Sequence, residues 1–398
     1  MTPWVTLVSD TPSGFGFPFG GDPEMFKDAP LFRELQRVMS SSVGPINWEL
    51  ARQVGIANAM EAGDDRAATE GELQGFEEAV RVAELQIAGF TGLEPPNDVA
   101  QVRAIRRAEW VSLNSESLRG LLEPAAARLS EAMEGVTREQ LPPEALAMGA
   151  FMSQLSPLLM GTQVGTVLGY LAQHVLGQYD VAVPRSGTAS VMFVMPNILA
   201  FEQDWSLDST DFRTWVALHE VTHRFEFAQP WAGSRLQDLL QDYLSTMQID
   251  VEGMQSRLSS LDAADPDSLQ ALMASDEGLF GATVDDEQRL KLARIQAFMA
   301  ATEGYADHVM HELGREWLPS YSRIDEAISR LGTPTDPVFE RLLGVEMKRE
   351  HYEAGRRFCD TVADMTDEAT LTRMWDSAEA MPSWPEVEEP RLWLARSV

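Results

Sequence analysis

The chain of 398 residues contains a single cysteine, Cys359, and few basic side chains. One cysteine cannot form a disulfide within the chain, so a fold stapled by disulfides is excluded and a reducing compartment is favoured. Lysine and arginine together number 31 against 62 acidic residues, which gives a formal net charge of −31 without any basic block. Because such a chain repels a phosphate backbone, we expect no nucleic-acid partner.

Targeting and membrane signals are also scarce. The first residues, "MTPWVTLVSDTPSGFGFPFGG", lack the basic and apolar regions of a signal peptide, so we predict a flexible tail over residues 1–28 and a cytoplasmic location. Residues 145–179 contain no charged side chain, but Ser, Thr, Gln and Pro dilute their hydrophobicity. A ridge of Gly161, Gly165 and Gly169 permits close helix contact. We interpret this stretch as a pair of buried core helices, with no stable membrane insertion.

Apolar residues recur with a helical period from Ala29 onward, which predicts a mainly α fold. Pro124 should kink or break one of the helices. "TASVMFVMPNI", residues 188–198, is the best strand candidate and predicts a small β element. We expect its residues 191–194 to form an edge that an extended peptide could pair with. A boundary near Arg185 would separate a helical N-terminal domain (29–185) from a catalytic domain (186–398), with a cleft between them.

The chemistry concentrates in "WVALHEVTHRFEF", residues 215–227. On a helix, His219 and His223 lie one turn apart on the same face, so both imidazoles can reach one metal ion. Zinc favours imidazole ligands and takes three protein ligands in catalytic sites, while Glu220 is placed to act as a general base. The alternative is a chance pattern on a buried helix. Apolar flanks and the N-cap candidates in "DSTDF" favour the predicted site for one Zn²⁺ per chain.

A third ligand must come from elsewhere in the chain. The extended metzincin pattern would need other residues at positions 226 and 229, where this chain has Glu226 and Gln229, so that class is excluded. A di-iron site is disfavoured because the chain has no second Glu-x-x-His. In "ATEGYADH", Glu303 and Asp307 resemble the Glu-x-x-x-Asp pair of gluzincins. This resemblance implies that Glu303 is the third ligand and that Asp307 orients His219. Rival ligands are Glu226, Asp238 and Asp242.

The residues around Glu303 are small, and we attribute Gly304 to a close helix approach that lets this carboxylate reach the metal. No oxyanion donor stands out from the sequence. The neighbourhood of Glu303 offers several polar candidates, for each of which an ordinary structural role is the alternative: His308, His311, Tyr305, Arg315 and Tyr321.

Several segments together resemble one family: "FGFPFGGDP", "GPINWELARQ", "HEVTH" and "EGYADH". The chain is similar to the actinobacterial-type zinc-dependent metallopeptidases, hydrolases with a zincin-like fold. The resemblance implies His219, His223 and Glu303 as ligands and Glu220 as base, and it implies no particular substrate.

The leading hypothesis is therefore a zinc hydrolase that cleaves a peptide or protein substrate. A binding or scaffold protein that retains the metal without turnover is the main alternative. A hydrolase associated with a membrane through residues 145–179 is a third.

Overall fold

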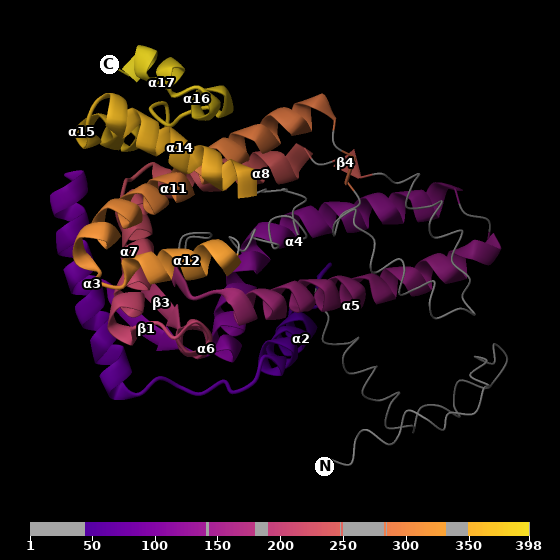
Figure 1. Cartoon of the computed structure of the whole chain (residues 1–398). Helices are drawn as coiled ribbons and strands as arrows, with labels where there is room; N and C mark the ends of the chain where they lie inside the picture. Colours follow the sequence, from indigo (N-terminus) through magenta and orange to yellow (C-terminus); the bar gives the residue numbers. More distant parts are fainter. Residues whose placement is uncertain are drawn as a thin grey trace.

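The computed structural model describes residues 44–140, 143–179, 190–246, 248–249, 282–283, 285–331 and 349–397. The tail expected over residues 1–28 lies outside these ranges. Helices dominate, as the periodicity predicted (Figure 1). The first part comprises α2 (Trp48–Glu61), α3 (Glu70–Thr91), β1 (Gln101–Ile105), α4 (Arg107–Gln140), α5 (Pro143–His174) and β2 (Gly177–Tyr179). Helix α4 continues through Pro124, where a kink or break was expected.

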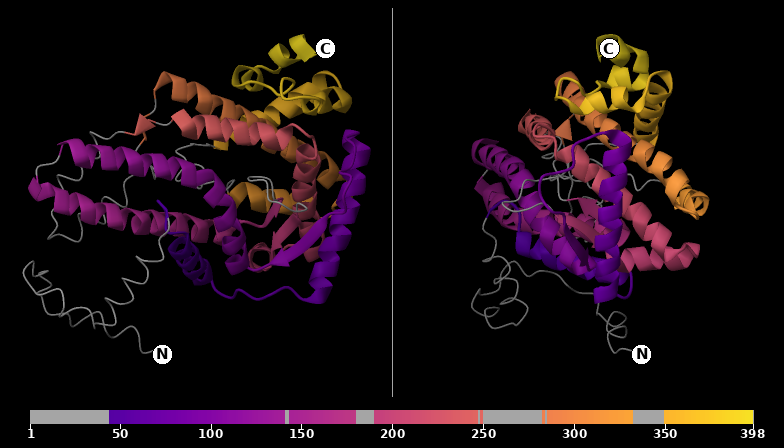
Figure 2. Two further views of the ribbon diagram at one scale, coloured as in Figure 1. Left: turned by 180° about the vertical axis from the view of Figure 1, so that it is seen from behind. Right: turned by 90° about the vertical axis from the view of Figure 1, so that its left-hand side faces the viewer.

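The second part begins with β3 (Ser190–Val194), α6 (Met195–Trp205), α7 (Ser209–Phe227), α8 (Ala232–Thr246), β4 (Gln248–Ile249) and β5 (Ala282–Thr283). It continues with α11 (Asp286–Trp317), α12 (Tyr321–Leu331), α14 (Arg349–Met365), α15 (Glu368–Thr372), the 3₁₀ turn η2 (Arg373–Trp375), α16 (Trp384–Glu388) and α17 (Pro390–Ser397). The C-terminal helices gather at one end of the molecule beside α11, while α4 and α5 extend together in another direction (Figures 1 and 2).

A three-stranded sheet lies beside α3, α6 and α7, in the order β1-β3-β2 (Figure 1). The predicted strand is β3, and all five of its residues are buried, in keeping with its apolar, β-branched composition. Strand β1 pairs with it in parallel and β2 pairs with it antiparallel. The expectation that residues 191–194 form an edge is therefore wrong: β3 is the central strand, and β2 is an outer one.

The boundary expected near Arg185 cuts through this sheet. Strands β1 and β2 precede it and β3 follows it, so the sheet needs both sides to form. Helix α7 is also tied to the N-terminal part, because the buried guanidinium of Arg224 donates to Glu84 (3.1 Å) and to the side chain and backbone carbonyl of Asp98. One hydrophobic core joins residues from both sides. Two separately packed domains with a cleft between them do not describe this arrangement.

Most of the uncharged stretch 145–179 belongs to α5, a single helix where a pair was expected, and its last three residues form β2. Its glycine ridge packs against α2. A methyl group added at Gly161 would lie 2.5 Å from the carbonyl oxygen of Asn47, and one at Gly169 would lie 2.5 Å from the Cβ of Asn58. The glycines thus permit contact between two helix backbones within the protein. Across the described ranges, no helix is both long enough and apolar enough to cross a bilayer.

Helices α7 and α11 pack against each other in antiparallel directions. Asp208 caps the start of α7 by accepting hydrogen bonds from the next backbone N–H groups, as predicted for this segment. Near the end of α7, the ring of Phe227 lies 6.4 Å from that of Phe298. At the other end, Asp211 accepts hydrogen bonds from the backbone (2.8 Å) and hydroxyl (2.6 Å) of Ser320, just after α11. These contacts fix the register between the two helices.

The opposite side of α11 crosses α14 at a pair of glycines. A methyl group added at Gly304 would collide with the backbone of Gly355 and Arg356, and one added at Gly355 would collide with the carbonyl of Ala300. The attribution of Gly304 to a close approach between Glu303 and the histidine helix is therefore wrong. This glycine allows α14 to lie on α11, which fixes α11 from behind.

His308 joins three helices at this end of the molecule. Its Nδ1 lies 2.7 Å from an oxygen of Asp360 on α14, and its Nε2 lies 3.0 Å from an oxygen of Glu368 on α15. Burial opposes the charged imidazole, but hydrogen bonds and charges from the two carboxylates outweigh it and raise the pKa of His308 to about 9. A buried imidazolium therefore bridges α11, α14 and α15.

This bridge predicts a pH-dependent stability. Because the folded-state pKa of His308 lies above the ordinary value of 6.5, its contribution is complete below about pH 6.5 and is lost as pH rises through about 9. The shift corresponds to roughly 3 kcal/mol at most. Urea unfolding of the wild type and of His308→Gln should therefore differ strongly at pH 6 and much less at pH 9.5. A difference that stays constant with pH would contradict the charged bridge.

Candidate metal centre

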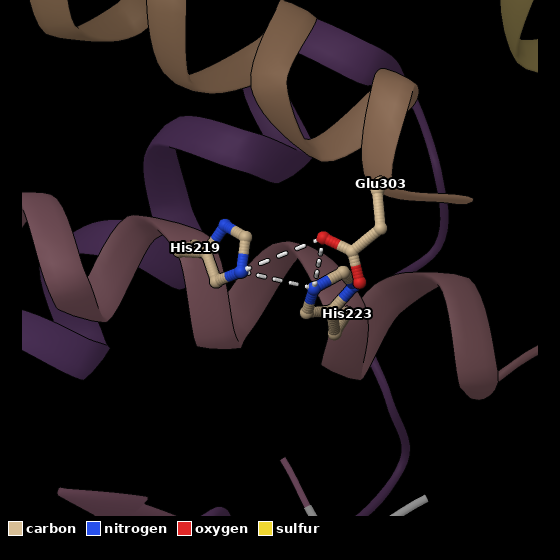
Figure 3. Close-up of side chains that lie close together, drawn as sticks. All are labelled: His219, His223 and Glu303. Carbon is tan, nitrogen blue, oxygen red and sulfur yellow. Dashed lines mark hydrogen bonds and ion pairs between the residues drawn. The ribbon is translucent and has the colours of Figure 1, made fainter. Parts of the chain in front are cut away.

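Two histidines of α7 and a glutamate of α11 converge on one point (Figure 3). The Nε2 atoms of His219 and His223 lie 3.2 Å apart. The Oε2 of Glu303 lies 3.9 Å from the first and 3.7 Å from the second. Glu303 comes from a helix that begins more than 50 residues after α7 ends, so only tertiary packing brings the three together. In the described part of the chain, these residues form the one group with the spacing of metal ligands.

This triangle fits zinc. Ligand atoms about 2.0–2.1 Å from a tetrahedral zinc ion lie roughly 3.3 Å from one another. The three distances observed, 3.2, 3.7 and 3.9 Å, need only a small inward movement of the Glu303 carboxylate to match this. Two imidazoles and one carboxylate also form a ligand set of catalytic zinc sites, which leaves the fourth position open. The side chains of His219 and Glu303 keep about a quarter of their surface exposed, which provides that opening.

Different partners hold the far sides of the two imidazoles. The Nδ1 of His223 lies 2.7 Å from the Oε2 of Glu226, one turn further along α7. The Nδ1 of His219 lies 3.0 Å from the sulfur of Met310. Asp307 was expected to orient His219, but Met310 occupies that place, and no hydrogen bond joins Asp307 to His219 among the contacts of the described residues. Glu226, a rival third ligand, lies behind His223 and away from the shared point.

Glu220 is seated against strand β2. Its Oε2 accepts a hydrogen bond from the backbone N–H of Tyr179 at 2.7 Å, and the side chain is almost fully buried. Gly177 makes room for it, because a methyl group there would lie 2.5 Å from Oε1 and 2.8 Å from Cδ of Glu220. The strand thus fixes the carboxylate that follows His219 in the sequence.

Electrostatics prepare Glu220 to exchange a proton near neutral pH. Burial raises the pKa of Glu220 to about 7; the charge of Glu303 adds to this effect, and His223 and the Tyr179 N–H oppose it. A general base works best when its pKa lies near the working pH. Burial also raises the pKa of Asp307 to about 7, with the charge of Glu303 again contributing.

The sequence matches one family over almost the whole described chain. The model of the family described as zincin-like metallopeptidase matches residues 46–394. The chain belongs to this family. It is also similar to a solved structure described as a "putative hydrolase with a novel fold from Chloroflexus aurantiacus", with 30% identity and a TM-score of 0.65. That match covers 88% of this chain and 98% of the other. None of the curated proteins compared with it matches the chain.

Membership in the zincin-like metallopeptidase family supports a hydrolase and implies a metal at the His-His-Glu group. Within this fold, several residues that the sequence offered for the site lie elsewhere. Asp242 pairs with Lys291 at 2.9 Å, and Asp238 is exposed on α8. His308 contacts Asp360 and Glu368 through its two ring nitrogens, so it is not available to an oxyanion.

Two of the remaining oxyanion candidates contact each other. The Nδ1 of His311 lies 2.9 Å from the hydroxyl of Tyr321, whose ring packs against Gly314. Tyr305 is fully buried, with its hydroxyl 3.3 Å from that of Thr372. Arg315 lies on the exposed last turn of α11. The pair of His311 and Tyr321 therefore stays a prediction for transition-state stabilisation, and Tyr305 has a structural position.

Three contacts were missing from the sequence reasoning: Glu226 with His223, Met310 with His219, and β2 with Glu220. The first had a local signal, because Glu226 follows His223 by three residues on the same helix face. The contacts of Met310 with His219 and of β2 with Glu220 depend on how distant segments pack, so no sequence periodicity predicts them.

The geometry predicts one zinc per chain with Glu303 as an essential ligand. Glu303→Ala should weaken zinc binding by several orders of magnitude, because two imidazoles alone hold the ion poorly. Asp242→Ala is the matched control, since it removes an acidic side chain from a neighbouring helix without touching the histidines. The measurement is the zinc content of each variant after dialysis, determined by mass spectrometry. Zinc should be lost from Glu303→Ala and retained by Asp242→Ala. Equal zinc content in the two variants would place the third ligand elsewhere.

Proposed function

We propose that the protein is a cytoplasmic zinc-dependent peptidase in which His219, His223 and Glu303 hold the metal and Glu220 is the general base. The observation that carries this proposal is the seat of Glu220: a buried carboxylate with a pKa of about 7, beside the His-His-Glu group and fixed by a strand. The single cysteine is in keeping with a reducing compartment. Family membership supports the hydrolase chemistry.

When bound, zinc supplies Lewis acidity that activates water and polarises a carbonyl group. The carboxylate of Glu220 takes a proton from the attacking water and passes it to the leaving amine. The Tyr179 N–H keeps this carboxylate in place through both transfers. The imidazoles of His219 and His223 keep their Nε2 atoms toward the metal because Met310 and Glu226 occupy their Nδ1 sides.

Strand β2 is the natural place for an extended substrate. The carbonyl of Leu176 accepts a hydrogen bond from the backbone N–H of Val194 in β3, so by the alternation of an antiparallel pair Gly177 and Tyr179 turn their backbone groups away from β3. Glu220 already accepts from the N–H of Tyr179 on that side. An extended peptide that paired with this edge through backbone groups other than the Tyr179 N–H would have its backbone next to the general base.

A binding or scaffold role is the second candidate function. It is favoured by the engagement of His308 and Tyr305 elsewhere in the structure, which leaves fewer groups to stabilise a transition state. In such a protein the metal would hold a partner segment without cleavage. The two roles differ in turnover: a peptidase cleaves its substrate repeatedly, whereas a scaffold protein binds its partner without cleaving it.

The test is hydrolysis of a peptide mixture by the zinc-loaded protein, followed by mass spectrometry. We expect cleavage by the wild type and a loss of about 10²- to 10⁴-fold in Glu220→Gln, because the amide cannot accept the proton. Zinc content should be the same in both proteins, since Glu220 is not a ligand. Zinc retention without any cleavage by the wild type, across peptides of varied sequence, would favour the scaffold role.

A subtler variant tests the seat of the base. Gly177→Ala should lower kcat by about 10- to 100-fold, because the added methyl group displaces the Glu220 carboxylate from Tyr179. Zinc content should not change. Gly75→Ala on α3 is the control, since a methyl group there meets no atom within 4 Å. Full activity in Gly177→Ala would show that the contact between β2 and Glu220 is dispensable.

A further inference from the structure

The two histidines of the proposed zinc site have different partners at their Nδ1 atoms, which the motif alone does not explain. The Nδ1 of His223 contacts a carboxylate, and the Nδ1 of His219 contacts a thioether sulfur. Glu226 has no contact with the solvent, with 0% of its side chain exposed. Burying a carboxylate is costly unless something compensates its charge. The Glu226 carboxylate must therefore have a partner that offsets the free-energy cost of its burial.

The contacts of Glu226 identify that partner. Its Oε2 lies 2.7 Å from the Nδ1 of His223, and its Oε1 has no hydrogen-bond partner among the described residues. Its buried neighbours Tyr305 and Cys359 carry no positive charge. In the described part of the chain, the one hydrogen bond of the Glu226 carboxylate is therefore the one with the imidazole of His223.

We propose that Glu226 is a positioning residue that holds His223 as a zinc ligand. This inference rests on the proposed zinc site. An ionised carboxylate only accepts hydrogen bonds, so the proton of the neutral imidazole stays on Nδ1 and the lone pair of Nε2 is directed at the metal. The same hydrogen bond fixes the ring plane and makes the imidazole a better electron donor.

The spacing of the two residues makes this arrangement compact. His223 and Glu226 are three residues apart on α7, so both belong to one rigid element and need no loop to meet. His219 has no equivalent residue: its Nδ1 faces a weakly accepting sulfur. Of the two imidazoles, only that of His223 has a carboxylate at its Nδ1 among the described residues. His223 is accordingly the more strongly held ligand, and Glu226 should matter more for zinc affinity than Met310.

The test is zinc affinity, measured by competition with a chromophoric chelator on the full chain. We expect Glu226→Ala to bind zinc 10- to 100-fold more weakly than the wild type, the usual effect of losing such a carboxylate. Glu226→Gln should lie between them, because the amide oxygen still accepts the Nδ1 hydrogen but has no charge. Met310→Leu should change the affinity less than Glu226→Ala.

The control variant is Glu202→Gln. Glu202 is also buried, and it pairs with Arg213 at 2.7 Å and accepts from Ser209, with no contact to a metal ligand. The substitution Glu202→Gln should lower the melting temperature of the metal-free protein and leave zinc affinity unchanged. Equal zinc affinity in Glu226→Ala, Glu226→Gln and the wild type would overturn the proposal, whatever their melting temperatures.

The absorption spectrum of the cobalt-loaded proteins separates positioning from ligation. A positioning role predicts that Glu226→Gln keeps the wild-type spectrum at saturating cobalt, whereas Glu303→Ala changes it. A spectrum altered in Glu226→Gln and intact in Glu303→Ala would make Glu226 itself the ligand and would overturn the proposal. Failure of the wild type to bind zinc at all would sink the proposed function together with this inference. Normal binding by the wild type with no effect of Glu226 would sink the inference alone.

Discussion

The candidate site depends on the register between α7 and α11. The histidines and Glu303 come from antiparallel helices, and a slip of one turn would move the carboxylate about 5.4 Å along the axis, out of reach of a shared ion. Contacts beyond the site prevent this slip: Phe227 against Phe298 at one end, and Asp211 with Ser320 at the other. The glycine crossing of α11 with α14 fixes α11 from its other side. The candidate metal centre is therefore formed by the packing of two helices.

Buried carboxyl groups with raised pKa values surround the His-His-Glu group. Burial raises the pKa of Glu220, Glu226 and Asp307 to about 7 each, so these carboxyl groups hold their negative charge at a cost. A divalent cation at the His-His-Glu group would favour the ionised forms of all of them. The buried imidazolium of His308 is instead paired with two other carboxylates, those of Asp360 and Glu368. The chain thus contains both a charge bridge that joins three helices and a group of carboxylates suited to a metal.

Local signals in the sequence predicted local structure well. The cap at Asp208, the helix from Ser209 and the strand around Phe193 all follow from short-range preferences, and the His-Glu-x-x-His spacing needs only a helix. The position of Glu303 beside the histidines came from a resemblance to gluzincins, since nothing local links residues 80 apart. The boundary near Arg185 was wrong because β1 and β2, of five and three residues, are too short to give a clear strand pattern in the sequence. Their pairing with β3 is decided by the tertiary core.

Strand β2 connects substrate binding to catalysis in the proposed mechanism. The same three residues form an outer strand of the sheet and hold Glu220, the proposed general base, through the N–H of Tyr179 and the space above Gly177. Glu220 is buried, so it cannot swing freely to accept a proton from an arbitrary direction. A peptide that pairs with β2 would then meet a base whose position is already fixed by the strand it binds. Because positioning of this kind lowers the entropy cost of a reaction, the small sheet would contribute to the proposed catalysis without supplying a catalytic side chain.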